Sequence, residues 1–244
     1  MSMGAEPDPP PDQGAAPDGA APDGAASDGA DTILLINPNT SAPALAMMLA
    51  AAAPHLPPGL RLRGVCAAAG VPMIVTEADL RVSAAEVVRL GRSAAVRAIV
   101  VAAFGDPGVE ALRALVSVPV IGLGAAAIAE AAAGGRRFGI ATTTPRLAGA
   151  IARLVARLSL SGSFTGTRVP GDDPLVLAGD PARQEIALAA AARLCFTRDG
   201  AQAVIIGGGP LSAAARSARV QDMGLIIEPV PAAIRRAVRL LAGG

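Results

Sequence analysis

From Asp31 onward, short aliphatic runs alternate with longer alanine- and arginine-bearing stretches that have a helical pattern. This alternation is typical of βαβ units, in which helices connect the parallel strands of a sheet. Runs such as Ile99-Val100-Val101 are apolar throughout, as expected for strands covered by helices on both faces. The sequence therefore predicts an α/β fold with parallel sheets. Strands are predicted at 33–37, 60–66, 98–103, 118–122, 138–142, 203–207 and 225–227, and helices at 43–53, 82–97, 109–116, 125–133, 146–158, 181–198 and 231–242.

The chain is predicted to divide into a tail and two lobes. Residues 1–30 consist mainly of Pro, Asp, Gly, Ala and Ser, so they are expected to form a disordered acidic tail. In the rest of the chain, a strand followed by a glycine turn occurs at 98–107 and again at 203–210. Two equivalent doubly wound lobes would place these turns at the carboxyl ends of two sheets, where open α/β proteins bind ligands. The first lobe is predicted to comprise residues 31–120 and about 225–244, and the second residues 121–224.

The net charge of +1 hides an uneven distribution of charged residues. Seven of the 20 acidic residues precede the first arginine, Arg61, so 21 basic side chains stand against 13 acidic ones in the rest of the chain. Such an excess suits a small anion or a nucleic acid. There is no Trp or Tyr for base stacking and no arginine-rich run, so no nucleic-acid partner is predicted.

The two cysteines and the single histidine exclude several kinds of site. Cys66 and Cys195 lie far apart in the sequence, and His55 has no second imidazole near it, so no metal site is predicted. The N-terminus has no signal-peptide pattern and no uncharged stretch is long enough to span a bilayer without Pro, Gly or Asn interrupting it. We therefore expect a cytoplasmic protein without a membrane partner.

One segment has the pattern of a dinucleotide-binding turn. Gly122-Leu123-Gly124 and Ala127 follow a predicted strand and begin a predicted helix, as in G-x-G-x-x-A. The next predicted strand ends in Thr142-Thr143-Thr144 and not in the Asp or Glu that would bind a ribose. The glycines are interpreted instead as allowing close approach of strand and helix, and no cofactor is predicted.

Two other polar turns follow predicted strands. In Asn37-Pro38-Asn39-Thr40-Ser41, a hydroxyl could simply cap the next helix, or the amides and hydroxyls could together bind a carboxylate or an imide. The same two alternatives apply to Thr142–Thr144.

Five segments carry a resemblance to a known family, and all five occur in the family's order. They are Ile36-Asn37-Pro38-Asn39-Thr40-Ser41, Phe104-Gly105-Asp106-Pro107-Gly108, Val118-Pro119-Val120-Ile121-Gly122, Thr142-Thr143-Thr144-Pro145-Arg146, and Asp199-Gly200-Ala201 leading into Val204-Ile205-Ile206-Gly207. From Thr32 to about Ala242 the chain resembles the aspartate/glutamate/hydantoin racemase superfamily, and hydantoin racemases most closely. The resemblance implies two pseudo-symmetric lobes, an active site in the cleft between them, and chemistry at a carbon α to a carbonyl without cofactor or metal.

The resemblance also implies two catalytic cysteines, one in each lobe, that exchange a proton with opposite faces of one carbon. Here Ala103 stands at the first of these positions and Gly208 at the second, and neither side chain can carry a proton. Cys66 and Cys195 are predicted to be structural, as free cysteines usually are. Asp106 is a weak candidate for a carboxylate base, and the alternative is that it caps the helix beginning near Val109. Pro210 removes one N–H donor from the second turn.

Three hypotheses about function remain open. The protein could be a cofactor-independent isomerase or lyase that acts on a small carboxylate, amino acid or hydantoin with other groups. It could be a non-catalytic relative that binds a small carboxylate or cyclic imide, or a chain whose natural cysteines have been substituted. In each case the predicted ligand contacts are Asn39, Thr40, Ser41, Phe104, Gly105, Thr142, Thr143 and Gly209. A homo-oligomer is expected.

Overall fold

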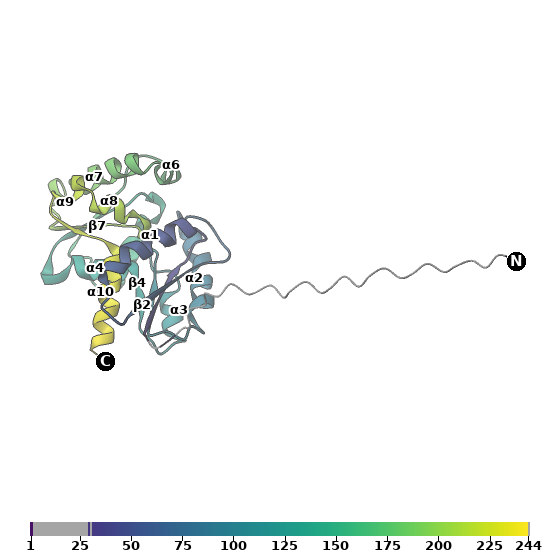
Figure 1. The fold of residues 1–244 in the computed structure, drawn as a ribbon. Coiled ribbons are helices and arrows are strands. Elements are labelled where there is room, and N and C mark those ends of the chain that lie inside the picture. Colours follow the sequence, from purple (N-terminus) through teal and green to yellow (C-terminus); the bar gives the residue numbers. More distant parts are fainter. Residues whose placement is uncertain (2–28, 30, 244) are drawn as a thin grey trace.

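The computed structural model describes Met1, Gly29 and residues 31–243, so the predicted tail lies almost entirely outside the described residues. Two parallel four-stranded sheets form the centre of the molecule (Figure 1). The first has the order β2-β1-β3-β4 and the second the order β6-β5-β7-β8, so the strands are connected in the same way in both lobes. The predicted α/β fold with two pseudo-symmetric parallel lobes is therefore confirmed. The strands are β1 (Thr32–Asn37), β2 (Arg61–Cys66), β3 (Ala98–Val101), β4 (Val120–Gly122), β5 (Phe138–Ala141), β6 (Phe164–Arg168), β7 (Ala203–Ile206) and β8 (Leu225–Ile227).

Helices cover both faces of the two sheets, as the continuous apolar strands require. The α-helices are α1 (Ala42–Ala52), α2 (Glu77–Gly91), α3 (Val109–Arg113), α4 (Leu123–Ala131), α5 (Ala148–Arg157), α6 (Pro174–Gly179), α7 (Pro181–Thr197), α8 (Ser212–Arg216), α9 (Ala218–Gln221) and α10 (Pro229–Ala242). Short 3₁₀ turns occur at Ala53–His55, Ala133–Gly135, Pro145–Leu147 and Gly209–Leu211.

The sheets divide the chain slightly differently from the predicted lobes. β4 belongs to the first sheet through Gly122, and β8 pairs with β7 in the second sheet. The chain returns to the first lobe only with α10, which packs against α1, α4, β3 and β4. The last strand therefore belongs to the second lobe, and only the helix after it completes the first.

A shared apolar core fixes the two lobes against each other. One buried cluster includes Ile33 and Leu35 of β1 together with Phe138 and Ile140 of β5, and it also contains residues of α4 and α10. Separate clusters fill the outer side of each sheet. Because α4 and α10 bury side chains in the shared cluster, the relative position of the lobes depends on these two helices.

The elements that sequence patterns missed are short or lack apolar runs. β6 is an edge strand of sequence Phe-Thr-Gly-Thr-Arg, and all five residues are half-buried. α2 was expected at 82–97 but spans Glu77–Gly91, because Thr76 and Asp79 form a capping box at its start. The short helices α6, α8 and α9 were not predicted, and each has six residues or fewer.

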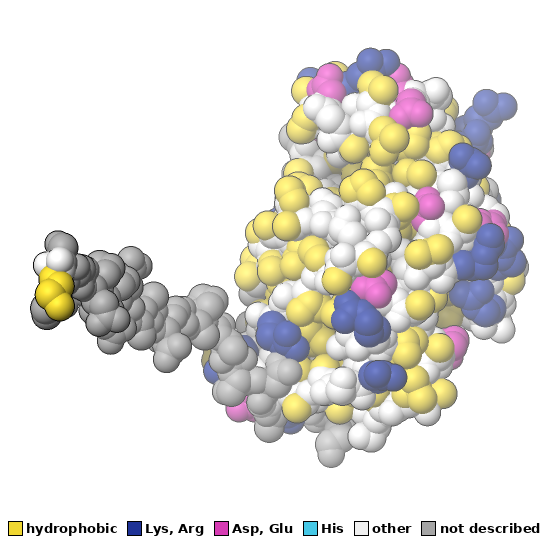
Figure 2. Space-filling model, turned by 90° about the vertical axis from the view of Figure 1, so that its right-hand side faces the viewer, with side chains coloured by type: hydrophobic (Ala, Val, Ile, Leu, Met, Phe, Trp, Pro, Cys, Tyr) yellow, Lys and Arg dark blue, Asp and Glu magenta, His cyan; other side chains and the backbone are white. Residues whose placement is uncertain are grey.

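Charged side chains are scattered on the face that Figure 2 shows. Arginines stand singly or in small groups, with apolar and acidic side chains between them. Elsewhere in the described chain, several arginines form ion pairs with acids, including Arg89 with Glu86 and Arg153 with Glu77. On this face the excess of arginine therefore forms no single basic patch.

Candidate active site

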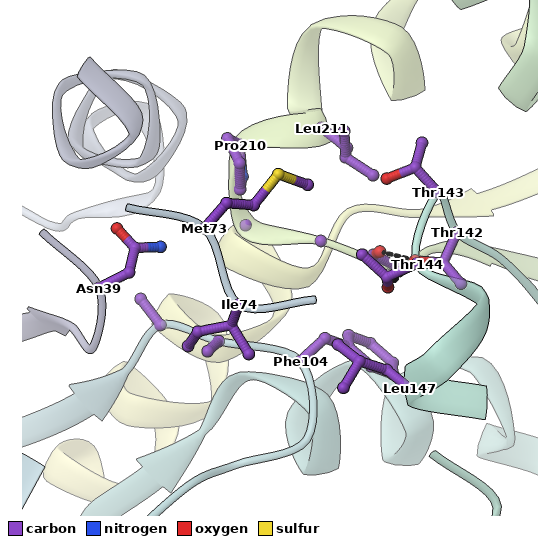
Figure 3. Close-up of a pocket in the computed structure, with 15 residues that line it drawn as sticks. Asn39, Met73, Ile74, Phe104, Thr142, Thr143, Thr144, Leu147, Pro210 and Leu211 are labelled. Atoms are coloured by element: carbon purple, nitrogen blue, oxygen red, sulfur yellow. Dashed lines mark hydrogen bonds between the residues drawn. The ribbon is translucent and has the colours of Figure 1, made fainter. Parts of the chain in front are cut away.

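A small pocket lies where the carboxyl ends of the two sheets meet (Figure 3). Most of its walls come from the segments that follow β1, β3, β5 and β7, which are the central strands of the two sheets, and the loop after the edge strand β2 adds to them. In each sheet the chain leaves neighbouring central strands in opposite directions, and ligands of open α/β sheets bind at such a point. The cavity volume is about 90 Å³. The lining residues are Asn39, Met73, Ile74, Ala102, Ala103, Phe104, Thr142, Thr143, Thr144, Leu147, Gly207, Gly208, Gly209, Pro210 and Leu211.

Asn39 reaches the pocket from the turn after β1. Its Oδ1 accepts hydrogen bonds from Asn37 Nδ2 at 2.8 Å and from the Ser41 N–H at 2.9 Å. Both acceptor sites of the amide oxygen are therefore used inside the turn. The Asn39 Nδ2 group lies on the pocket side in Figure 3. This leaves the NH₂ group as a donor for a ligand carbonyl.

The three threonines after β5 are buried and have different partners. Thr142 Oγ1 donates to the carbonyl of Gly207 at 2.7 Å, which ties the end of β5 to the end of β7. Since this bond uses the Thr142 proton, Thr144 Oγ1 must be the donor in its 3.2 Å contact with Thr142 Oγ1. The Thr143 hydroxyl points toward the pocket in Figure 3. Of the two predicted hydroxyl donors, Thr143 is thus the one free to bind a ligand.

Ala103 and Gly208 line the same pocket from opposite lobes. They are the positions at which the family resemblance implied two cysteines. Among the described residues that line the pocket, none has an ionisable side chain. The lining thus offers neutral donors, backbone groups and apolar side chains, and it offers no group suited to general acid–base catalysis.

Several predicted contacts lie outside the lining. The Thr40 N–H donates to the Val71 carbonyl at 3.1 Å. Ser41 Oγ accepts from the Ala44 N–H at 3.2 Å and so caps α1, which is the structural alternative considered for this turn. Gly105 adopts a φ of 119°, and it shapes the turn next to the lining residue Phe104. The pocket brings together Asn39, Phe104, Thr142, Thr143 and Gly209 from the predicted set, and their role as ligand contacts remains a prediction.

Four apolar residues of the lining were not predicted from the sequence. Met73 and Ile74 come from the loop between β2 and α2, Leu147 from the turn before α5, and Leu211 from the turn after β7. From the sequence alone, an isolated apolar residue in a loop that lines a pocket looks the same as one that packs in the core. The nearest signal is the short apolar segment Val71-Pro72-Met73-Ile74-Val75, which lies in a loop without strand or helix periodicity.

Asp106 caps α4, not the helix near Val109 that the sequence suggested. Its carboxylate accepts the N–H groups of Gly124 at 2.6 Å and Ala125 at 2.8 Å. Burial raises the pKa of Asp106 to about 6, although the two N–H donors and the charges of Arg113 and Arg157 oppose this. The N-terminus of α4, where a dinucleotide would place its phosphates, is thus already occupied by a carboxylate of the chain.

The two cysteines lie outside the pocket lining. Cys66 Sγ lies 3.5 Å from Asn37 Nδ2 and from the Ser41 carbonyl at the base of the first turn. Cys195 is fully buried in α7, and burial raises the pKa of its thiol to about 11. A thiol with such a pKa carries almost no thiolate at neutral pH, so the predicted structural role of Cys195 fits its surroundings.

Two absences hold for the described part of the chain. No three residues among its His, Cys, Asp and Glu side chains are grouped so that they could hold a metal ion. In the same part, no helix is both long enough and apolar enough to cross a bilayer.

The two-lobed parallel fold with a pocket between the carboxyl ends of its sheets defines a class of α/β proteins that includes racemases. The Asp/Glu/Hydantoin racemase family matches residues 33–237, and the chain belongs to this family. It is similar to a hydantoin racemase of Rhizobium meliloti, with 30% identity over 225 residues that cover 87% of this chain and 89% of that protein.

Two solved structures agree in fold with this chain. An allantoin racemase from Klebsiella pneumoniae superposes with a TM-score of 0.82 at 30% identity, covering 87% of this chain and 88% of the other. An allantoin racemase from Pseudomonas fluorescens gives the same TM-score at 24% identity, with 87% and 92% coverage. The two-lobed fold is therefore shared along nearly the whole of these proteins.

Proposed function

We propose that the protein binds a small uncharged cyclic amide or imide, such as a hydantoin ring, and does not racemise it by proton transfer between two thiols. The observation that carries this proposal is the composition of the pocket. Its described lining has amide, hydroxyl and backbone groups at the turns after β1, β3, β5 and β7, and Ala103 and Gly208 in place of acid–base groups.

The absence of charge in the lining favours a neutral ring over a free amino acid or dicarboxylate. A buried carboxylate without a charged or multiply hydrogen-bonded partner is costly, because burial removes its hydration. A ring with alternating C=O and N–H groups instead needs neutral partners. The Asn39 amide and the Thr143 hydroxyl can supply donors, and the N–H group of the lining residue Phe104 has no backbone acceptor among the described residues.

The relatives support the ring as the ligand class. Those with 30% identity are described as hydantoin racemase and allantoin racemase, and allantoin contains a hydantoin ring. Met73, Ile74, Phe104 and Leu147 provide apolar surface against which one substituent of such a ring can pack.

Binding and chemistry can be separated in one set of measurements. Calorimetric titration with 5-methylhydantoin should show saturable binding, and titration with aspartate should not. Thr143→Val removes one donor at constant volume and should weaken the binding roughly tenfold, as expected for one buried hydrogen bond. Thr197→Val is the matched control, because Thr197 Oγ1 donates to the Arg193 carbonyl on the exposed side of α7, outside the pocket lining.

When the same ligand is incubated with the protein in D₂O, the hydrogen at C5 should exchange with deuterium no faster than it does in buffer alone. Accelerated exchange would favour the alternative, an isomerase or lyase that uses groups other than a thiol pair. No binding of any hydantoin by a folded sample would refute the proposal.

A further inference from the structure

Asp106 connects the pocket wall to α4. The residues two and three positions before it, Phe104 and Ala103, line the pocket. The Asp106 N–H donates to the Ala103 carbonyl at 3.1 Å, and its carboxylate accepts two N–H groups from the first turn of α4. The same residue thus holds the turn after β3 on one side and a helix N-terminus on the other.

The sequence around Asp106 is arranged to permit this contact. Asp106 has a φ of 54°, a conformation that Asp and Asn tolerate better than most residues, and its neighbours Gly105 and Gly108 also have positive φ. A Cβ at Gly122 would overlap the carboxyl group, and one at Gly124 would lie 3.1 Å from Oδ1. The Phe-Gly-Asp-Pro-Gly and Gly-Leu-Gly segments therefore form one structural unit.

The helix has no other side-chain cap. α4 has no acidic residue in its first turn, and Gly122 at its N-cap offers no side chain. A carboxylate at this end is stabilised by two N–H donors and by the helix dipole. Without it, the two N–H groups would lose their acceptor.

α4 also reaches the other lobe. It packs against β7 and β8 of the second sheet and against α10. The turn after β7 supplies Gly207–Leu211 to the pocket. Asp106 thereby links the wall from the first sheet to a helix that also packs against the second sheet.

We propose that Asp106 is a positioning residue, which fixes the Ala103–Phe104 wall relative to α4, and that ligand binding requires its carboxylate to be ionised. This inference rests on the proposed function for its ligand. An ionised carboxylate accepts both N–H groups. A protonated one has one fewer acceptor, so the turn is held less firmly.

The charged groups that act on Asp106 are Arg113 of α3 and Arg157 of α5. Both favour the ionised form, and burial opposes them, so that the pKa is raised to about 6. The carboxyl group should therefore change its protonation state between pH 7.5 and pH 5. The imide N–H of hydantoin does not ionise in this range, so the ligand itself adds no pH dependence.

The test measures the affinity for 5-methylhydantoin between pH 5 and 7.5 in the wild type, Asp106→Asn and Asp173→Asn. Asn keeps the size and tolerates the same φ, but its NH₂ group cannot accept a hydrogen bond. Asp173 is the matched control, because its carboxylate accepts the Leu175 and Val176 N–H groups at the start of α6, outside the pocket lining. Wild type and Asp173→Asn should lose affinity roughly tenfold below pH 6, the loss expected for one charge-assisted hydrogen bond. Asp106→Asn should bind weakly at every pH.

A folded Asp106→Asn protein that binds with the affinity and pH profile of the wild type would overturn the proposal. A merely structural role would lower the melting temperature of Asp106→Asn and leave its affinity unchanged, and this result would also overturn it.

A second measurement uses the wild type without ligand, so it is decisive even if the variant does not fold or no hydantoin binds. The amide signals of Gly124 and Ala125 and the methyl signal of Ala103 should titrate together in NMR spectra with a midpoint near pH 6. If the Ala103 methyl signal does not follow the two amides, the proposal is wrong. If the three signals titrate together but no hydantoin binds, the proposed function is wrong and the positioning role of Asp106 still holds.

Discussion

The turn after β3 and the turn after β7 occupy equivalent places in the two lobes but are held by different interactions. The first contains Asp106, whose carboxylate binds the N-terminus of α4. The second is tied through the Gly207 carbonyl to the hydroxyl of Thr142, and Gly209 lies against Met48 of α1. One anchor is ionisable and the other is neutral, so the two halves of the pocket should respond differently to pH and to substitution.

The two turns also differ in how much space they leave for a larger side chain. At Gly208, a Cβ would meet Leu211 Cδ1 at 2.8 Å, and Leu211 is the flexible side chain of a pocket residue. Ala103 already has a Cβ and faces the same cavity. A cysteine should therefore fit at position 103 in the first turn without rearrangement, whereas a cysteine at position 208 in the second turn should require Leu211 to move.

The largest expected effect is a gain of proton exchange in Ala103→Cys/Gly208→Cys. If the turns stand on opposite faces of the bound ring, two thiols should accelerate exchange of the C5 hydrogen of 5-methylhydantoin in D₂O by roughly 10²-fold or more, the usual range for positioned acid–base groups. The measurement is loss of the C5 proton signal in NMR spectra.

Each single cysteine variant and Gly208→Ala serve as controls for this gain. Gly208→Ala tests whether displacement of Leu211 alone changes binding. A folded double variant that binds the ring but exchanges no hydrogen would show that Ala103 and Gly208 do not correspond to the cysteine positions of the family.

The next largest effect is expected at the anchor of the first turn. Gly122→Ala would place a methyl group on the Asp106 carboxyl group and should lower the free energy of unfolding by about 2–3 kcal/mol, as overpacking in a rigid site does. Chemical denaturation would measure this. Gly171→Ala is the control, because no atom lies within 4 Å of its added Cβ. Equal stability of the two variants would contradict the tight contact between Gly122 and Asp106.

Thr142→Val tests the anchor of the second turn. It leaves the buried Gly207 carbonyl without the hydroxyl donor, so the free energy of unfolding should fall by about 1–2 kcal/mol. Thr197→Val, on the exposed side of α7, should change it by less than about 0.5 kcal/mol. A small effect at Thr142 would mean that packing, and not the hydroxyl, holds the second turn.

The sequence predicted most of the sheets because their strands are continuous apolar runs, whereas it missed β6, whose residues Phe164–Arg168 include Gly166 and two threonines. Asn39 and Thr143, which line the pocket, were predicted as ligand contacts because polar residues directly after a buried strand stand out, and this role remains a prediction. Met73 and Leu147 were not predicted, because an apolar residue in a loop has no periodicity.

Asp106 was identified as a capping residue but with the wrong helix. A cap within the next turn can be seen in a sequence, while the contact of Asp106 with Gly124 and Ala125 joins residues 18 and 19 positions apart. Only the packing of β3 beside β4 brings these residues together.

The smallest expected effect concerns two acids, one in each lobe, whose contributions to folding stability should change in opposite directions on acidification. The pKa of Asp106 is raised in the folded state, so folding favours its protonated form. Its contribution to stability is therefore largest below 3.8, the pKa in the unfolded chain, and is lost as the pH rises through about 6, the pKa in the folded protein. Asp199 is the opposite case, because its ion pair with Arg168 lowers its pKa. Its contribution is present above pH 3.8 and is lost as the pH falls.

Denaturation of the wild type, Asp106→Asn and Asp199→Asn at pH 3 and pH 7 would separate the two acids. Relative to Asp106→Asn, the wild type should gain stability on acidification, by on the order of 1 kcal/mol. Relative to Asp199→Asn, it should lose stability by no more than about 1 kcal/mol, as a partly exposed pair does. If the wild type lost stability on acidification relative to both variants, the folded protein would favour the ionised form of Asp106, as it favours that of Asp199. Acidification would then weaken both lobes alike, and the ionisable anchor would no longer distinguish the first turn from the second.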